Sequence, residues 1–325
     1  MKHLACSFTR TRQAGAALLT AMLTVALVAS LAAGALWQQW RSIEVEAAER
    51  ARAQSLWVLT GALDWARLIL REDGRAGGAD YLAEPWAVPL EEARLSTFLA
   101  ADKNTSADLD DSASQAFLSG LITDLQSRLN VTNLVEGEKL SEPSFKAFAK
   151  LFEILGLPPG ELKTLAENLR LALGESSGND TAPLLPQRIE QLVWLGLSPR
   201  SVTVLKPYIT LLPVRTPVNL NTANATVLYA CIPGLDMAQA QRLMSARENN
   251  HFRTLADATA QLGKTAQPLT EAQHSVNSRF FEIQGRLRLD QTVVEEHSVV
   301  QRDGLDVKTL WRDQGASERQ SRPLQ

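Results

Sequence analysis

The sequence predicts an α+β chain in which a long N-terminal helix packs on an antiparallel sheet and an all-helical region is inserted between the strands. Three observations support this. An uncharged run near the N-terminus continues directly into a segment with helical periodicity, and strand-like segments both precede and follow a block of helical segments. The 325 residues are 45% hydrophobic and 21% charged, which is ordinary for a folded protein.

The net charge of −3 at pH 7 disfavours a general nucleic-acid binder, which needs a positive surface. Basic residues without acids mark the first fifteen positions, at Lys2, Arg10 and Arg12, so the remaining chain is still more acidic. Cys6 lies in this basic segment and Cys231 far along the chain among apolar residues. We therefore predict no disulfide and a buried free thiol at Cys231.

The N-terminal segment allows three interpretations. A secretory signal peptide would be cut near Ala33-Gly34-Ala35, but the uncharged run 16–36 is longer than a usual signal core and long enough to span a bilayer. A plain membrane anchor is the second interpretation, and a segment cut at Gly15 and packed against similar subunits is the third. In the last two, the basic residues 1–15 place the N-terminus in the cytoplasm and the body outside.

The run 16–36 and the stretch that follows it predict one helix over 16–74. From Ile43 to Leu70 there is no proline, and apolar residues recur at helical spacing. The helix is expected to end near Asp73-Gly74, where turn residues begin.

Strand-like alternation predicts the first strands of the sheet within 75–138 and the last two or three within 273–315. The stretch 115–135 has strand character, with Gly120 and Asp124 as possible bends and with Asn130 and Asn133 suited to a turn. The polar residues 316–325 predict a loose tail.

Helix signals fill the block between these strands and suggest two modules, 139–213 and 214–272. The first module begins with Ser141 as a helix cap and resembles the stacked hairpins of sterile-alpha-motif-like domains. In the second, Asn221 or Thr222 is expected to cap a helix, and Pro233-Gly234-Leu235 to turn the chain into a helix that starts at Asp236.

The second module resembles a helix-hairpin-helix unit. In nucleic-acid-binding versions, a glycine-rich hairpin presents backbone N–H groups to a phosphate at a helix N-terminus. Asp236 stands in place of a second glycine here, and its charge would repel a phosphate, although Arg242, Arg247 and Arg253 could still touch a nucleic-acid backbone. We predict a protein-packing module, with a membrane-anchored DNA-uptake protein as the alternative.

A hydrophobic helix that runs into an amphipathic one, behind a basic leader ending in glycine, resembles the type IV pilins and pseudopilins. The resemblance implies that a prepilin peptidase cuts between Gly15 and Ala16 and methylates the new N-terminus at Ala16, and that the sheet is pilin-like. Most members have Glu as the fifth residue after the cut, thought to neutralise the terminal amine of a neighbouring subunit. A carboxylate in lipid is costly unless it is paired. Thr20 in its place fits a subunit at the filament tip; alternatively, Thr20 is simply tolerated in a membrane helix.

Five stretches together resemble the minor pseudopilin K family of type II secretion systems, in the order found there. They are RQAGAALL, ARAQSLWVLTGALDWARLILRED, SGLITDLQSRLNVTNL, PYITLLPVRTPVNLNTANATVLYACIPGL and NSRFFEIQGR. The resemblance implies a non-enzymatic subunit of the bacterial inner membrane with a periplasmic body. It also implies a tip complex with minor pseudopilins I and J, contact with other pseudopilins, and a role in exporting folded proteins across the outer membrane.

Neither a cofactor nor a catalytic site is predicted. Members of the family commonly carry an acidic loop associated with calcium, which needs six to eight oxygen ligands. The corresponding stretch is LALGESSGNDTAPLLPQ, and its carboxylates are Glu175 and Asp180. Two carboxylates are few ligands for a calcium ion. The histidines show no metal-ligand spacing, and no nucleophile or nucleotide-binding motif is present.

Overall fold

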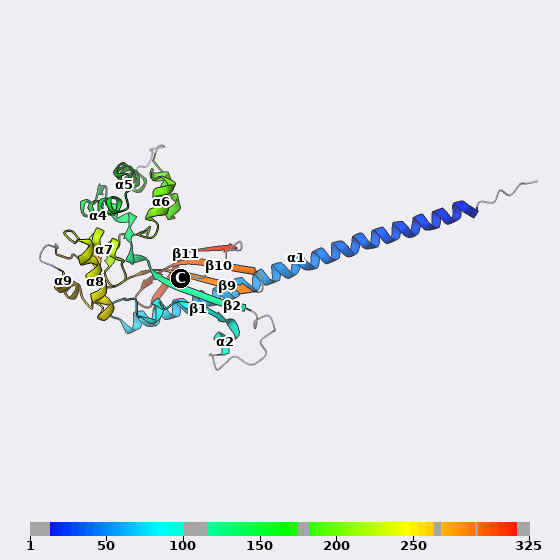
Figure 1. Ribbon diagram of the computed structural model, residues 1–325, viewed down its shortest axis with the longest axis horizontal. Helices are drawn as coiled ribbons and strands as arrows, with labels where there is room; N and C mark the ends of the chain where they lie inside the picture. The colour runs from blue at the N-terminus through cyan, green and yellow to red at the C-terminus, as the bar shows by residue number, and fades with distance from the viewer. Residues whose placement is uncertain (1–13, 101–115, 175–181, 263–267, 290–291, 317–325) are drawn as a thin grey trace, which may run out of the picture. The chain divides into compact units, whose positions relative to one another are not determined.

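The computed structural model describes residues 14–100, 116–174, 182–262, 268–289 and 292–316 (Figure 1). The chain divides into two compact units between Leu56 and Trp57. The first unit contains the N-terminal part of helix α1 (Ala14–Ala76), and the second contains the rest of α1 and the body.

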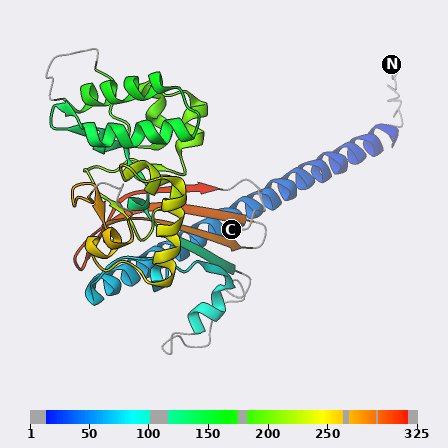
Figure 2. The ribbon, with the colours of Figure 1, turned by 60° about the vertical axis from the view of Figure 1, so that its left-hand side comes forward.

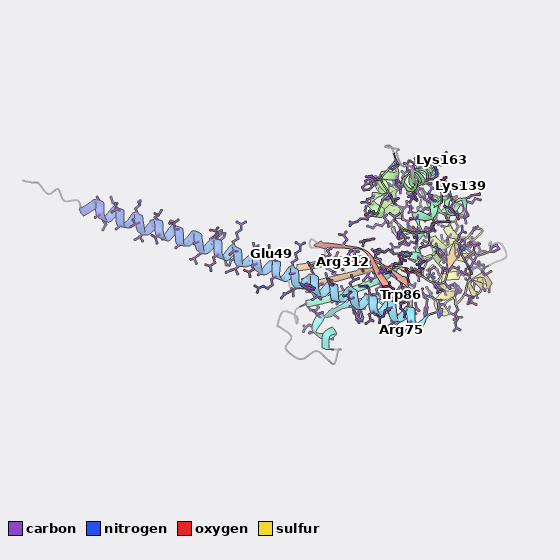
Figure 3. All side chains as sticks on the ribbon, turned by 180° about the vertical axis from the view of Figure 1, so that it is seen from behind. Glu49, Arg75, Trp86, Lys139, Lys163 and Arg312 are labelled. Carbon is purple, nitrogen blue, oxygen red and sulfur yellow. The ribbon has the colours of Figure 1, made fainter. Side chains whose placement is uncertain are left out.

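In the first unit, the described part is helix, apolar over 16–36, and its side chains from 16 to 50 are exposed on every side (Figure 3). Among the described residues, α1 is the one helix long and apolar enough to cross a membrane, with a mean hydropathy of 2.2 in its most apolar window. The helix ends two residues later than the sequence suggested. Gly77 takes φ +68°, and its N–H donates to the Asp73 carbonyl at 3.0 Å, which closes the last turn.

The body contains a five-stranded antiparallel sheet in the order β1-β2-β9-β10-β11. The strands are β1 (Leu90–Arg94), β2 (Ala116–Asp124), β9 (Phe280–Leu289), β10 (Thr292–Asp303) and β11 (Asp306–Ala316). Ile122 of β2 lies opposite Ile283 of β9, so strands from before and after the helical block pair directly. The helical block is therefore an insertion within one sheet, and the predicted α+β class is confirmed.

Helix α1 covers one face of this sheet. Leu63, Ala66 and Leu70 are buried against sheet residues and against Trp86 of the short helix η1 (Pro85–Ala87), with the ring of Trp86 edge-on to Phe281 at 5.2 Å. The sequence suggested a bend at Gly120, but this residue lies within β2, opposite Gly285 of β9. A Cβ at Gly285 would lie 3.2 Å from the Leu59 side chain, so the glycine lets the helix approach closely.

The strand within 115–135 ends at Asp124, one of the two bends expected from the sequence, and the backbone turns again at Asn130, which was expected to suit a turn. Polar side chains turn the backbone, because Asp124 accepts from the Gln126 N–H at 2.7 Å and Asn130 accepts from the Thr132 N–H at 3.2 Å. The short helices η2 (Leu125–Ser127) and η3 (Val131–Leu134) result, with β3 (Leu129–Asn130) between them.

Two groups of helices make up the inserted region and share one apolar cluster (Figure 2). The first group is α4 (Glu142–Ile154), α5 (Pro159–Leu173), η4 (Ile189–Leu195) and α6 (Pro199–Leu205); the second is α7 (Ala225–Cys231), α8 (Met237–Asn249) and α9 (Leu255–Gln261). Short strand pairs connect them, namely β3 with β6 (Ile209–Thr210), β4 (Val135–Glu136) with β5 (Lys139–Leu140), and β7 (Val218–Asn219) with β8 (His274–Ser275). The boundaries between modules 139–213 and 214–272 stay a prediction.

The helix caps differ from the sequence expectation at two places. Asn224, not Asn221 or Thr222, caps α7 by accepting from the Val227 N–H at 2.9 Å. Asn221 exchanges two hydrogen bonds with the Phe252 backbone, and the Thr222 hydroxyl donates to Asp124, so both side chains are already engaged. Ser141 precedes α4 without a side-chain cap bond.

Gly196 provides a test of the packing between α5 and η4. Its φ is +101°, and a Cβ there would lie 2.5 Å from Thr164 Cγ2. We expect Gly196→Ala to lower the free energy of unfolding of the full chain in detergent by about 1–3 kcal/mol, from backbone strain and this clash. Gly137→Ala is the matched control, since φ is +62° there and no atom lies within 4 Å of the added Cβ. Equal losses in both variants would refute the clash with Thr164.

Candidate functional site

The residues of the predicted processing site lie in the first turn of α1. Gly15 and Ala16 are its second and third residues, and the Thr20 hydroxyl donates to the carbonyls of Ala16 at 3.1 Å and Ala17 at 2.9 Å. Thr20 therefore satisfies its own polar group inside the helix and needs no partner in an apolar medium. At the other end of the apolar run, the rings of Trp37 and Trp40 lie 5.5 Å apart, as in an interfacial aromatic pair.

A buried polar cluster connects the sheet to the inserted helices. The carboxylate of Asp124, at the end of β2, is 2% exposed and accepts four hydrogen bonds. The donors are Ser278 Oγ at 2.6 Å, Thr222 Oγ1 at 2.5 Å, Asn219 Nδ2 at 3.1 Å and the Gln126 N–H at 2.7 Å. Burial raises the pKa of Asp124, and these donors oppose the rise.

The same cluster reaches the C-terminal end of α1 through Asp80 and Arg302. Asn219 Nδ2 donates to the Asp80 carbonyl at 3.1 Å, and the Ser278 N–H donates to the Asp80 carboxylate at 2.6 Å. Arg302, on β10, donates to Asp80 Oδ1 at 2.5 Å and also to Asp73 of α1. We call Asp73, Asp80, Asp124, Asn219, Ser278 and Arg302 the junction cluster, because they join α1, the sheet and the helical region.

Glu84 lies beside the junction cluster and completes a group of three carboxylates with Asp73 and Asp80. Its carboxylate accepts from Trp86 Nε1 at 2.7 Å and from the Tyr81 N–H at 3.0 Å. Burial raises the pKa of Glu84 to about 7, and repulsion from Asp73 and Asp80 adds to the rise. A calcium ion does not fit this group well, because the Arg302 guanidinium already binds two of the three carboxylates.

The helix-hairpin-helix turn is occupied by its own side chain. Asp236 caps α8 by accepting from the Gln239 N–H at 2.7 Å, and the Gln239 side chain accepts from the Asp236 N–H at 2.9 Å. The carboxylate thus takes the helix N-terminus at which a phosphate would bind.

The three candidate nucleic-acid contacts are not brought together as one surface. Arg247 is buried and donates to the carbonyls of Leu220 and Ala223, both at 2.6 Å, and burial lowers its pKa to about 10. Arg242 and Arg253 are exposed. Arg247 is therefore a packing residue of the second helical group.

The remaining candidates are two carboxylates, a cysteine and a histidine. Glu175 and Asp180, the calcium candidates, lie outside the described residues. Cys231 is a buried free thiol, as expected, and burial raises its pKa to about 12, so it is not a nucleophile. His274 is buried between the Cys231 carbonyl and the Thr270 N–H, and burial lowers its pKa.

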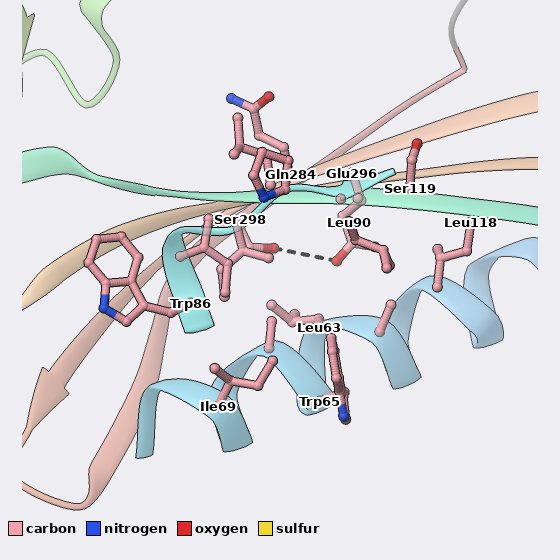
Figure 4. A pocket seen from close by; sticks show the side chains of 18 of the residues that line it. Leu63, Trp65, Ile69, Trp86, Leu90, Leu118, Ser119, Gln284, Glu296 and Ser298 are labelled. Atoms are coloured by element: carbon pink, nitrogen blue, oxygen red, sulfur yellow. Dashed lines mark hydrogen bonds between the residues drawn. The ribbon is translucent and has the colours of Figure 1, made fainter. Parts of the chain in front are cut away.

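An apolar groove lies between α1 and the sheet (Figure 4). Its volume is about 250 Å³, and its lining includes Ala62, Trp65 and Ile69 of α1, Leu90 of β1 and Val88 just before β1. The buried Glu296 carboxylate at the groove accepts from Arg312 Nε at 2.5 Å and from Ser298 Oγ at 3.4 Å. The groove is therefore apolar in lining, with its one described carboxylate already paired.

The sequence did not single out the junction cluster. Asp124 was interpreted as a bend, and Asn219 lies 95 residues away from it. A signal was available in the alternation of Val218, Asn219 and Leu220, since an amide between apolar residues needs buried partners. That signal does not identify the partners.

The long apolar helix, packed at its C-terminal end on an antiparallel sheet, gives a pilin-like arrangement with a helical insertion. Two profiles of the family described as Type II secretion system (T2SS), protein K, match residues 127–214 and 218–277. The chain is 28% identical over 332 residues to the type II secretion system protein K of Pseudomonas aeruginosa, covering 94% of each chain.

The fold is also similar to a chain in the crystal structure of the GspK-GspI-GspJ complex from enterotoxigenic Escherichia coli. The TM-score is 0.58 at 17% identity, over 83% of this chain and 99% of that chain. The chain is therefore similar to proteins of the type II secretion system protein K family in sequence and to one of them in fold.

We expect Asp124→Ala to lower the free energy of unfolding of the full chain by about 2–4 kcal/mol, because each buried donor left without an acceptor costs about 1–3 kcal/mol. Asp306→Ala is the control, since that carboxylate is exposed and pairs with Lys308 at 3.0 Å. The control should change stability by less than about 0.5 kcal/mol. Similar losses in chemical denaturation of the two variants would contradict the role of Asp124.

The raised pKa of Glu84 makes stability depend on pH. A carboxyl group whose folded pKa exceeds its unfolded pKa stabilises the fold below the unfolded value and loses that contribution as pH rises through the folded value. The free energy of unfolding should therefore fall from about pH 5 to about pH 8. Glu84→Gln should flatten this slope, and an unchanged slope in that variant would assign the dependence to other groups.

Proposed function

We propose that this chain is a minor pseudopilin that acts as a non-enzymatic assembly subunit at the tip of a type II secretion pseudopilus. The tip would contain minor pseudopilins I and J and rest on the other pseudopilins, and the assembly would export folded proteins across the outer membrane. The main support for this proposal is the similarity to the Pseudomonas aeruginosa protein K over 94% of both chains. The similarity in fold to a chain of the GspK-GspI-GspJ crystal structure supports partners of the I and J type.

The proposal places α1 as a single-pass anchor in the inner membrane, with the N-terminus in the cytoplasm and the body in the periplasm. The length and apolar character of α1 support a spanning segment. The basic residues of the leader support the orientation. Prepilin peptidase would cut between Gly15 and Ala16 and methylate Ala16.

The tip position is supported by Thr20. Its hydroxyl bonds within its own helix, so it offers no carboxylate for the terminal amine of a neighbour. A subunit that has no neighbour above it needs none.

The alternative DNA-uptake function receives no support from the hairpin. Asp236 occupies the phosphate position at α8, and Arg247 is buried. The assembly role also requires no cofactor and no catalytic residue.

We expect Gly15→Leu to block processing and secretion, because a bulky side chain at the cut position cannot enter the peptidase site of a pilin-like substrate. Full-length chain should accumulate in the membrane, seen by mass spectrometry of the N-terminus, and exported protein should disappear from the medium.

Gly34→Leu is the matched control for this test. Gly34 lies in α1 with no atom within 4 Å of an added Cβ, and it belongs to the alternative signal-peptide site. This variant should be cut after Gly15 like the wild type. Cleavage near Ala35, or normal secretion by uncut Gly15→Leu, would overturn the proposed function.

A further inference from the structure

A cleft of about 460 Å³ separates the first helical group from the sheet. Residues of β9, β10 and β11 form one wall, and residues around η4 and just after α6 form the other. In Figures 1 and 2, which show the chain from two directions, β11 is the strand of the sheet next to the first helical group. The cleft therefore lies between two parts of the body that are far apart in the sequence.

The sheet wall of the cleft is the face opposite to α1. Glu296 and Ser298 of β10 line the groove beside α1 (Figure 4), and side chains alternate along a strand. His297, between them, points to the other face, where it is paired in register with Asp313 of β11. Glu282 of β9 lies on the same face, with its Oε1 3.7 Å from His297 Nδ1. A histidine thus lies between two carboxylates on the sheet wall.

One ion pair crosses the cleft. Arg188, the residue before η4, has its Nη1 2.9 Å from Asp313 Oδ2, and its guanidinium lies 5.7 Å from the centre of the Trp311 ring. We call Arg188, Trp311 and Asp313 the clasp. The side chains of Arg188 and Asp313 are 51% and 49% exposed. An ion pair this exposed stabilises only weakly, so a change of one neighbouring charge is enough to alter its balance.

An apolar contact joins the two walls beside the clasp. Leu125 and Val299, which line the cleft, belong to a buried apolar cluster. Its other members are Leu212, in the segment after β6, and Phe280 of β9. Burial of apolar surface does not depend on the protonation of a side chain, whereas the clasp consists of charges. The walls can therefore separate at the clasp while the apolar contact is kept.

Several charged side chains face His297 or line the cleft with it. They are Arg128, Arg188, Glu190, Lys206, Glu282, Arg286, Glu295 and Asp313. Two pairs within the same wall largely cancel. Lys206 Nζ lies 2.6 Å from Glu190 Oε1, and Arg286 Nε lies 3.6 Å from Glu295 Oε1.

The charges that remain attract the two walls when His297 is neutral. Glu282 and Asp313 leave two negative charges on the sheet wall, and Arg128 and Arg188 bring two positive charges to the cleft. Interaction with the Glu282 carboxylate raises the pKa of His297, although burial opposes this, so the imidazole gains its proton near neutral pH. The charged ring then offsets one of the two negative charges and competes with Arg188 for Asp313.

We propose that His297 sets the width of the cleft: neutral, it leaves Asp313 to Arg188 and the clasp closed, whereas charged, it draws Asp313 away and lets the first helical group move off the sheet. The clasp is closed at mildly alkaline pH and opens as the pH falls. This inference concerns the body alone and is independent of the assembly role proposed above.

The test measures a distance across the cleft in the full chain in detergent, at about pH 8 and about pH 5.5. Nitroxide labels are attached at Lys163→Cys in α5 and Thr309→Cys in β11, two exposed positions, in a chain that carries Cys6→Ser. Cys231 is buried and stays unlabelled. Pulsed electron paramagnetic resonance should show a longer-distance population that grows about threefold at the lower pH, the size expected when one exposed ion pair is weakened.

Three variants separate His297 from other titrating groups. His297→Gln keeps a polar side chain without a charge and should give the closed distance at both pH values. Asp313→Asn removes the charge that Arg188 binds and should give the longer distance at both. His251→Gln is the matched control, because the His251 ring lies outside the cleft and stacks on Tyr81 at 3.8 Å. It should respond to pH like the wild type.

Four results would overturn the inference. They are a wild-type distance distribution that is the same at both pH values, a pH response that His297→Gln retains, a closed distance in Asp313→Asn at about pH 8, and loss of the response in His251→Gln. Thermal unfolding of each variant near the wild-type temperature would show that the distances report the cleft of a folded chain.

Discussion

The body depends on one buried carboxylate, that of Asp124. A charge removed from water is tolerated where several donors meet it, and those donors come from distant parts of the chain. Thr222 and Asn219 come from the helical region, Ser278 from the segment before β9, and Gln126 from the turn after β2. The inserted helices must therefore return to one place at the end of β2, or four donors and one carboxylate lose their partners.

Arg302 extends this constraint to the C-terminal end of helix α1. Its guanidinium contacts Asp73 of α1 and Asp80, and Asp80 bonds to Ser278. The end of α1, the end of β2, the inserted helical region and the segment before β9 thus share one hydrogen-bonded cluster. The cluster gives the helical region a defined attachment to both the sheet and the C-terminal end of α1. The Arg302 guanidinium lies 4.9 Å from the centre of the Phe281 ring, which packs in the same apolar cluster as Leu70 and Val300.

Local patterns predicted the elements better than their connections. The helix through residue 74 and the last strands followed from periodicity in continuous segments. The stop of β2 at Asp124 did not, because alternation in Leu125 and Leu129 continues past the point where side-chain bonds turn the backbone. Arg247 was considered a surface contact, since its burial depends on carbonyls of Leu220 and Ala223 that only the folded hairpin presents. Caps, buried polar partners and cross-chain pairs are tertiary properties, and one sequence holds few signals for them.

One rule accounts for both the membrane helix and the body: a polar group away from water must find its partner within the protein. Thr20 solves this within one turn, through the carbonyls of Ala16 and Ala17, and so makes no demand on a neighbour. Asp124 solves it with residues brought together by the whole fold. Part of α1 has the opposite character, because the apolar side chains of Trp57 and Leu68 are 77% and 46% exposed. Thr20 and Asp124 thus have their partners within the chain, whereas an exposed apolar side chain such as Trp57 can lose its contact with water only against another molecule.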